Sequence, residues 1–181
     1  MSKKKKIILI IRISLLVIVA VGAVIGFKIV NEKITKKQAE EFTVQQNNGS
    51  YNIGIDELYV EGKELKIKGW CFIKNGRTIH FDENIKLAVI LRNENDHSDL
   101  IRMTTDRYLR PELNEMFTPK SGVDYKYSGV EAEESVSRFD MEHGSYEVFV
   151  FYDIWDGDHG YYGITTDYKM VNGKLVNITE G

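Results

Sequence analysis

Three carboxylates stand close together between two apolar stretches near the end of the chain. They are Asp153, Asp156 and Asp158, with Gly157 and Gly160 beside them. Carboxylate oxygens are the ligands that Ca²⁺ prefers, which makes the three residues a candidate metal site. Their spacing differs from that of an EF-hand, which also needs a distal glutamate. Since Asp-Gly is itself a frequent hairpin turn, we favour a turn here and predict no metal or cofactor.

The single cysteine, Cys71, is a candidate nucleophile. Wall transpeptidases that use a cysteine have an earlier histidine and a Thr-Leu-x-Thr-Cys strand, and this sequence has neither. Cys71 instead alternates with Ile67 and Ile73, so we expect a buried, inert thiol in a central strand that also carries Trp70. The histidines lack metal-ligand spacing and stand in predicted turns. They are His80, His97, His143 and His159.

Aromatic residues give the best indication of a binding surface, because they dominate measured binding energies. Trp155 and Tyr161 flank a predicted hairpin loop, and loops commonly carry recognition. We expect partner contact to centre on this hairpin and on the segment 110–112. The expected contact residues are Trp155, Asp156, Asp158, Tyr161, Tyr162, Arg110 and Glu112. A structural role for Arg110, pairing with a loop carbonyl or an acid, is the alternative.

The other aromatics lie on predicted strand faces. Trp70 and Phe72 share one face, and Phe149 and Phe151 share another. Exposed aromatics on such faces can stack on sugars or anchor a partner. For Phe149 and Phe151 we expect the opposite, namely that the irregular segment 106–140 covers them as a second small core.

The elements that position these residues are mostly strands. A shift in the alternation at Asp56 predicts a bulge, and Pro111 predicts a short helix through Leu113, Met116 and Phe117. A further short strand is expected within 127–138. Apolar and polar residues alternate with period two over 51–60, 65–73, 85–91, 100–105, 146–155 and 161–171. This pattern predicts an all-β antiparallel sandwich over residues 51–181.

Charge and cysteine content restrict the class of protein. Residues 1–50 carry a net charge of +6 and residues 51–181 a net charge of −9, which gives −3 for the chain. The acidic part argues against nucleic acid as a partner. One cysteine permits no internal disulfide, so packing must supply the stability.

A long apolar stretch at residues 7–30 predicts a transmembrane signal anchor. The 21 residues from Ile7 to Phe27 span roughly 31 Å as a helix, close to a hydrocarbon core of about 30 Å. The basic tail at 1–6 favours a cytoplasmic N-terminus, with a stalk and linker at 31–50 and the domain outside. The polar run 45–50 reads as flexible.

Two alternatives concern the anchor. A cleaved signal peptide would place a small-x-small site after an apolar region at 13–27, but the small residues lie within that region. We therefore favour an uncleaved anchor. Gly22 and Gly26 form a GxxxG pair, which allows a weak homodimer through the membrane, although two small residues in such a span are commonplace.

Four short motifs follow one another along the predicted domain: Gly69-Trp70-Cys71-Phe72, Arg110-Pro111-Glu112-Leu113, Ser128-Gly129-Val130 and Gly144-x-Tyr146. Together they resemble an immunoglobulin-like domain that accompanies glycosyltransferases and cell-surface glycan proteins of Gram-positive bacteria. The first resembles its "GWAF" strand and the second its Arg-Pro-Asp-Val segment, with Glu112 in place of Asp. The third resembles its Ser-Gly-Phe, with Val130 in place of Phe, and the fourth its Gly-x-Tyr strand. The resemblance implies an immunoglobulin-like fold and a cell-envelope setting, but no activity, because the transferase of those proteins is a separate domain.

Two functions of different classes follow. The first is a membrane-anchored extracellular binding or scaffold module that engages an envelope protein or glycan. The second is a glycan-processing enzyme that uses surface carboxylates. Since the sequence contains no nucleophile, phosphate or metal motif, we favour the first.

Overall fold

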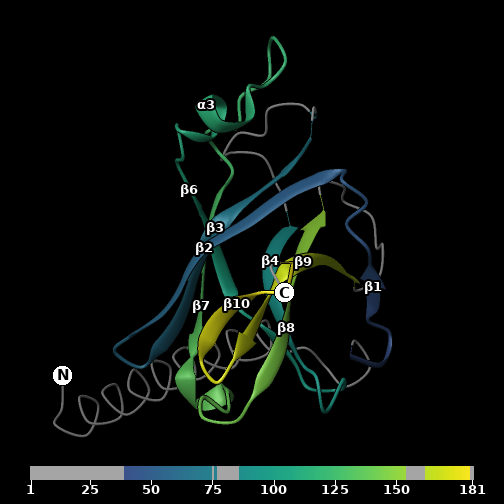
Figure 1. Ribbon diagram of the computed structural model, residues 1–181, viewed down its shortest axis with the longest axis vertical. Coiled ribbons are helices and arrows are strands. Elements are labelled where there is room, and N and C mark those ends of the chain that lie inside the picture. Colours follow the sequence, from purple (N-terminus) through teal and green to yellow (C-terminus); the bar gives the residue numbers. More distant parts are fainter. Residues whose placement is uncertain (1–38, 75, 77–85, 154–161, 180–181) are drawn as a thin grey trace, which may run out of the picture. The chain divides into compact units, whose positions relative to one another are not determined.

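The structure is a computed structural model that describes residues 39–74, 76, 86–153 and 162–179 (Figure 1). The predicted tail and anchor, with Gly22 and Gly26, lie outside these residues. In the described part of the chain, no helix has the length and apolar character needed to cross a membrane. The topology predicted for the N-terminal stretch stays a prediction.

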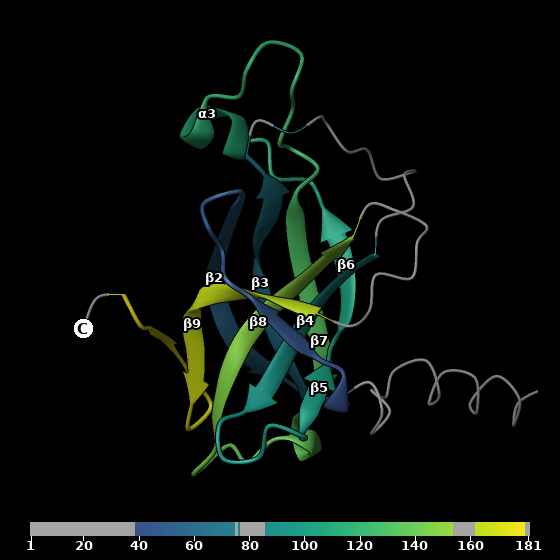
Figure 2. The ribbon, with the colours of Figure 1, turned by 90° about the vertical axis from the view of Figure 1, so that its right-hand side faces the viewer.

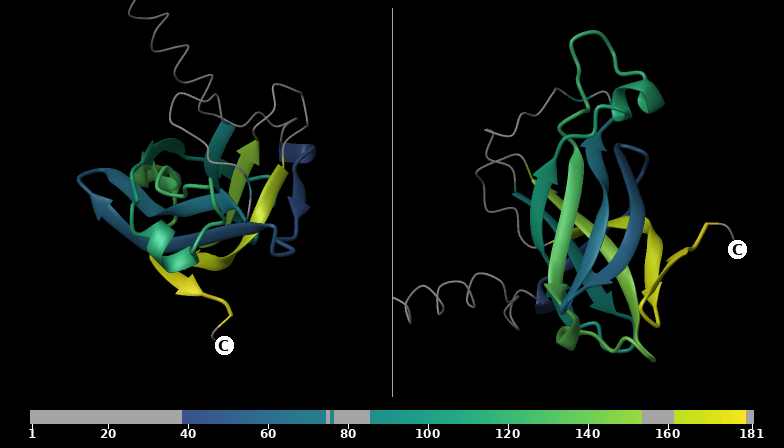
Figure 3. Two further views of the ribbon diagram at one scale, coloured as in Figure 1. Left: turned by 90° about the horizontal axis from the view of Figure 1, so that it is seen from above. Right: turned by 90° about the vertical axis from the view of Figure 1, so that its left-hand side faces the viewer.

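The described residues form two β-sheets with little helix, which confirms the all-β prediction. In sheet B, β3 lies between β2 and β7, so the strand that carries Trp70 and Cys71 is central, as predicted. The right-hand view of Figure 3 shows these strands side by side. In order, sheet B consists of β2 (Tyr51–Glu61), β3 (Glu64–Ile73), β7 (Gly129–Ser135) and β6 (Thr104–Tyr108), each antiparallel to its neighbours.

Sheet A contains the remaining strands (Figure 2, where sheet A lies in front of sheet B). In order, it consists of β1 (Thr43–Gln45), β9 (Tyr162–Val171), β8 (Ser145–Asp153), β4 (Lys86–Asn93) and β5 (Leu100–Arg102). A further strand, β10 (Lys174–Asn177), also pairs with β9. The neighbours are antiparallel, except that β1 runs parallel to β9.

The facing sides of the two sheets share one apolar core. Along β3, Leu65, Ile67 and Cys71 are buried, while the lysines between them are partly exposed. Val89 and Val150 of sheet A line the same narrow gap as Ile67 and Cys71 of sheet B. Removing these alternating side chains from water is the main force that holds the sheets together. The predicted bulge is present, because the pairing of β2 with β3 shifts at Asp56.

The structure differs from the expected stalk and linker at 31–50 in the portion that it describes. Residues 43–45 form β1, and the ring of Phe42 packs edge-on against Phe149 with centroids 5.6 Å apart. The Asn47 amide donates to Thr165 Oγ1 over 3.0 Å. The polar composition suggested flexible chain because it offers no apolar anchor of its own, but β9 supplies the backbone partners.

Phe149 and Phe151 are buried, as expected, but a different segment covers them. Phe42 and the Arg92 guanidinium lie over Phe149, and the Tyr162 ring contacts Phe151 at 5.0 Å. The irregular segment instead contains α3 (Leu113–Phe117), the loop after it and a 3₁₀ turn, η1 (Val136–Arg138). Figures 1 and 2 show α3 at one end of sheet B.

Candidate functional site

A second apolar cluster lies where α3 and the following loop meet β3; we call it the aromatic cap. Phe72 stacks on Tyr125 with ring centroids 4.0 Å apart and meets Phe117 edge-on at 5.1 Å. Aromatic pairs in these geometries contribute beyond the area they bury. The cap consists of Trp70, Phe72, Leu113, Phe117, Val123 and Tyr125.

Hydrogen bonds close the loop of the cap. The Asn114 side chain accepts from the Tyr125 amide at 2.7 Å and donates to Asp124 at 2.8 Å. The amide of Arg110 donates to the Lys126 carbonyl at 2.7 Å. Asparagine side chains favour such local bonds to backbone, which gives the loop a defined shape without a strand or long helix. These bonds hold the loop of the cap against α3.

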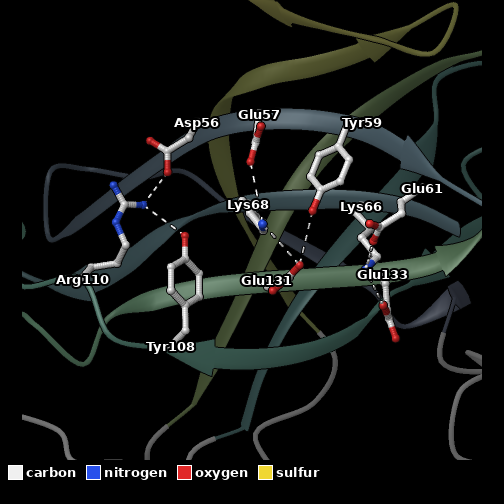
Figure 4. Close-up of polar contacts among 10 residues, drawn as sticks. All are labelled: Asp56, Glu57, Tyr59, Glu61, Lys66, Lys68, Tyr108, Arg110, Glu131 and Glu133. Carbon is white, nitrogen blue, oxygen red and sulfur yellow. Dashed lines mark hydrogen bonds and ion pairs between the residues drawn. The ribbon is translucent and has the colours of Figure 1, made fainter.

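Arg110 lies beside the cap with only 14% of its side chain exposed. Its guanidinium pairs with Asp56, and Nη1 donates to the Tyr108 hydroxyl at 3.3 Å (Figure 4). It also pairs with Glu112. The same group lies 5.5 Å from the centre of the Trp70 ring. A planar, permanently charged guanidinium is suited to pairing and stacking at once. These contacts fit the alternative considered for Arg110, in which it pairs with an acid as a structural residue.

Two glycines make room for this arrangement. A side chain at Gly129 would stand 2.6 Å from Arg110 Cγ, and one at Gly54 would stand 2.1 Å from the Trp70 ring. The indole nitrogen of Trp70 is buried and lacks a hydrogen-bond partner among the described residues. Trp70, Arg110 and Gly129, which come from three separate motifs, therefore meet at one place.

The charges of this cluster hold each other in the ionised form. The hydrogen bond from Arg110 lowers the pKa of the Glu112 carboxyl. Burial opposes the charge of Arg110, but its bonds to Glu112 and Asp56 outweigh that effect and raise its pKa. Both groups stay charged at neutral pH, so the edge of the cap is a stable ion-pair cluster.

Beyond the cap, the outer face of sheet B is a ladder of charged pairs (Figure 4). Lys66 Nζ lies 2.7 Å from Glu61 and 3.6 Å from Glu133. Lys68 Nζ lies 3.7 Å from Glu131. Opposite charges across neighbouring strands favour this register, but exposed pairs contribute little each. The ladder is a solvated face.

The predicted contact residues are described only in part. Trp155, Asp156, Asp158 and Tyr161 lie outside the described residues, and the partner contact predicted for them stays a prediction. Asp153 ends β8, and the metal site predicted weakly with Asp156 and Asp158 also lies largely outside them. Tyr162 is buried, and its hydroxyl donates to the Tyr152 carbonyl at 2.6 Å, so its ring is not on the surface.

Cys71 is buried against the facing sheet, and burial raises the pKa of its thiol. A thiol held protonated is a poor nucleophile, in agreement with the inert role predicted from its alternation. His97 and His143 are exposed, while His80 and His159 lie outside the described residues. Among the described residues, no three His, Cys, Asp or Glu side chains are grouped so as to hold a metal ion.

A polar pocket lies away from the cap, beside β9 in sheet A. Glu147, Thr165, Asp167 and Lys169 are among its lining residues, and its volume is about 270 Å³. The sequence does not predict it, because Gln46 lies in the expected linker, Ile178 lies beyond the last predicted strand, and the bulge that brings them together leaves no pattern. The motifs of the resemblance do indicate the region of the cap, because they contain Trp70 of the cap and its neighbours Arg110 and Gly129.

Comparison of the chain with protein-family models, curated proteins and solved structures finds no match.

Proposed function

We propose that this chain is a membrane-anchored, extracellular binding or scaffold module of a bacterial cell envelope, built on an immunoglobulin-like domain. It engages an envelope protein or glycan through the aromatic cap, and the predicted hairpin at 155–161, which lies outside the described residues, is a second candidate contact. Residues 7–30 hold the domain at the membrane.

The strand order supports the immunoglobulin-like part of the proposal. Lettering β2, β3, β4, β6, β7, β8 and β9 as A to G gives the order A-B-E-D in one sheet and G-F-C in the other, with β5 beside C. That is the arrangement of an immunoglobulin-type sandwich. The edge strands β1 and β10 are additions to it.

A second feature supports the same fold. Tyr146 stands at the start of β8, and its hydroxyl accepts the Asp140 amide at 2.9 Å. A tyrosine near the start of strand F that bonds back to upstream backbone is the tyrosine corner of these sandwiches. A side chain at Gly144 would stand 2.6 Å from the Tyr146 ring, which explains the Gly-x-Tyr motif.

The observation that carries the binding function is the cap itself. It lies at the end of sheet B, and two large apolar side chains of the same segment stay exposed: Leu109, which follows β6, at 52% and Met116, in α3, at 57%. Rigid surfaces with exposed apolar anchors bind partners at a low ordering cost. Arg110 and its acids form a polar rim beside them, as interfaces commonly have.

Affinity capture of the full-length anchored chain from its native membrane tests this function. Replacing Leu109 and Met116 together by serine should abolish capture of the partner and leave the melting curve unchanged. Val60→Ser is a matched control, because Val60 is equally exposed at 50% but lies on β2. The pair Trp155→Ala with Tyr161→Ala tests the hairpin. Unchanged capture by both double variants would exclude both the segment beside the cap and the hairpin as the binding surface.

Protease treatment of intact cells tests the location. The domain beyond residue 50 should be digested on intact cells, whereas a cytoplasmic control protein should not. A domain that stays protected would overturn the topology. Mature protein free in the medium and beginning near residue 27 would identify a cleaved signal peptide instead of an anchor.

The enzymatic alternative has weaker support. A glycan hydrolase of the usual kind needs a carboxyl group with a raised pKa as its general acid. Among the described residues, every carboxyl with a shifted pKa has it lowered, because hydrogen bonds stabilise the charged form. These are Glu61, Glu94, Asp96, Glu112, Asp124 and Asp140.

A further inference from the structure

The pocket beside β9 arises from an irregularity in the pairing of β8 with β9. Glu147 pairs with Lys169, but Phe149 pairs with Thr165. One residue of β8 therefore faces three residues of β9, 166–168, and β9 must bulge. Bulges of this kind often lie beside functional sites, because they redirect side chains and interrupt pairing.

The outer edge of β9 is divided at the same place. β1 pairs with residues 162–164, and β10 pairs with residues 168–171, which leaves an interval between the two strands. The chain leaves β1 through Gln46 and leaves β10 through Ile178, and both residues line the pocket. The Ile178 amide donates to the Asp167 carbonyl at 2.9 Å, which fixes that wall. The pocket is therefore formed by the fold and is not a gap between side chains alone.

The charges around the pocket are nearly balanced. Glu147 is paired with Arg92 at 2.6 Å, and Lys169 is paired with Glu94. Both pairs are held within the protein, so neither charge is left over for a ligand. Asp167 is the remaining charged lining residue, and it is exposed.

The polar lining both donates and accepts hydrogen bonds. Thr165 Oγ1 accepts from the Asn47 amide at 3.0 Å and lies 3.5 Å from the Gln46 amide oxygen. Gln46 keeps its two N–H donors, and Asp167 offers acceptor oxygens. Tyr168 and Ile178 add apolar surface. Such a lining does not select strongly for a cation or an anion.

We propose that this pocket binds a single saccharide ring. Each sugar hydroxyl both donates and accepts a hydrogen bond, so it needs the mixed donors and acceptors found here, and the C–H face of the ring needs apolar surface. The volume of about 270 Å³ lies just below the range of drug-sized ligand sites and suits one ring. A Ca²⁺ ion would need more than one uncompensated carboxylate, and a phosphate would be repelled by Asp167. The site lies in sheet A, away from the cap, so this proposal and the proposed function stand or fall separately.

Titration of the full-length chain in detergent micelles with N-acetylglucosamine tests the proposal, with backbone amide NMR signals as the readout. The signals of residues 46 and 165–169 should shift with saturation at millimolar sugar, and glycerol should leave them unchanged. Asp167→Asn should weaken binding on the order of tenfold, because a neutral amide replaces a charge-assisted acceptor. Gln46→Trp should block it by filling the pocket mouth.

Asp106→Asn is the matched control, because Asp106 is an exposed acid on β6 in the other sheet, and it should bind like the unchanged chain. Both Asp167 and Gln46 are exposed, so their variants should keep the native spectrum. Absence of shifts at residues 165–169 at high sugar concentration would overturn the proposal. Shifts that persist unchanged in the Gln46→Trp variant would overturn it as well.

Discussion

Tyr146 illustrates how much one buried polar atom contributes. Its ring is 2% exposed, and its hydroxyl is the acceptor for the Asp140 amide at 2.9 Å. Tyr146→Phe should lower the free energy of unfolding by about 0.5–1.5 kcal/mol, because it removes the part-buried hydrogen bond from the Asp140 amide. Urea denaturation measures the change. Tyr59→Phe is the control, since the Tyr59 hydroxyl bonds to the charged side chains of Glu131, at 3.4 Å, and Lys68 on the outer face of sheet B, where its loss should have little effect. Equal losses in both variants would contradict a tyrosine corner.

Cys71 tests the opposite change, in which a substitution introduces a polar hydroxyl into an apolar core. The residue is 2% exposed in the core between the sheets. Cys71→Ser should cost on the order of 1–3 kcal/mol of unfolding free energy if the new hydroxyl finds no partner. Cys71→Ala keeps the site apolar and should cost less than the serine variant. A thermal melt in which serine is tolerated better than alanine would show that the site is not an apolar one.

At the scale of elements, the strands that carry their own pattern were predictable. β3 alternates buried and partly exposed residues along nearly its whole length, and the shifted alternation of β2 predicts its bulge at Asp56. The short helix predicted after Pro111 is α3, which begins at Leu113. The edge strands β1 and β10 were missed because their residues are too few to show a period. β1 pairs with residues 162–164, more than a hundred residues away, so only tertiary pairing makes it a strand. β10 follows β9 directly and pairs with it as a hairpin.

The segment before the sandwich should therefore contribute to stability. Phe42 packs against Phe149, and the Arg92 guanidinium lies 6.0 Å from its ring centre. Phe42→Ala should lower the free energy of unfolding by about 1–2 kcal/mol, since a partly buried aromatic ring is removed. Val44→Ala, at a side chain that is 37% exposed in the same segment, should change it by less than about 0.5 kcal/mol. If the urea curves of Phe42→Ala and the unchanged chain coincide, the segment does not stabilise the sandwich, and the predicted flexible linker is the better interpretation.

For the whole molecule, the sequence could predict the all-β class but not how the surface features are assembled. The alternation predicts two packed sheets, whereas the pocket at β9 depends on a bulge, a short parallel strand and the tail meeting at one point. Likewise, the pairing of Arg110 with Asp56 joins residues 54 positions apart. Resemblance to short motifs brought Trp70 and Arg110 to attention, and the contact between them explains why both belong to one pattern.

The lowered carboxyl pKa values predict how the whole domain responds to acid. A hydrogen bond from Arg110 lowers the pKa of Glu112, and one from Lys169 lowers the pKa of Glu94. A hydrogen bond from the backbone amide of His143 lowers the pKa of Asp140. When the folded pKa lies below the unfolded one, the unfolded chain binds more protons, so stability is full above the unfolded pKa and falls as pH drops through the folded one. The ordinary values are 4.5 for Glu and 3.8 for Asp, which places the loss below about pH 4.5.

Urea denaturation of the chain in micelles at pH 7, 5, 4 and 3 checks this response. The free energy of unfolding should stay nearly level from pH 7 to 5 and fall steadily from there to pH 3. Glu112→Gln removes one lowered carboxyl, so the variant should be less stable at pH 7 and should lose less stability between pH 5 and 3 than the unchanged chain. Glu115→Gln, on the exposed side of α3, is the control and should follow the unchanged chain. A level curve down to pH 3 would mean that these ion pairs and hydrogen bonds are not formed more strongly in the folded state than in the unfolded one.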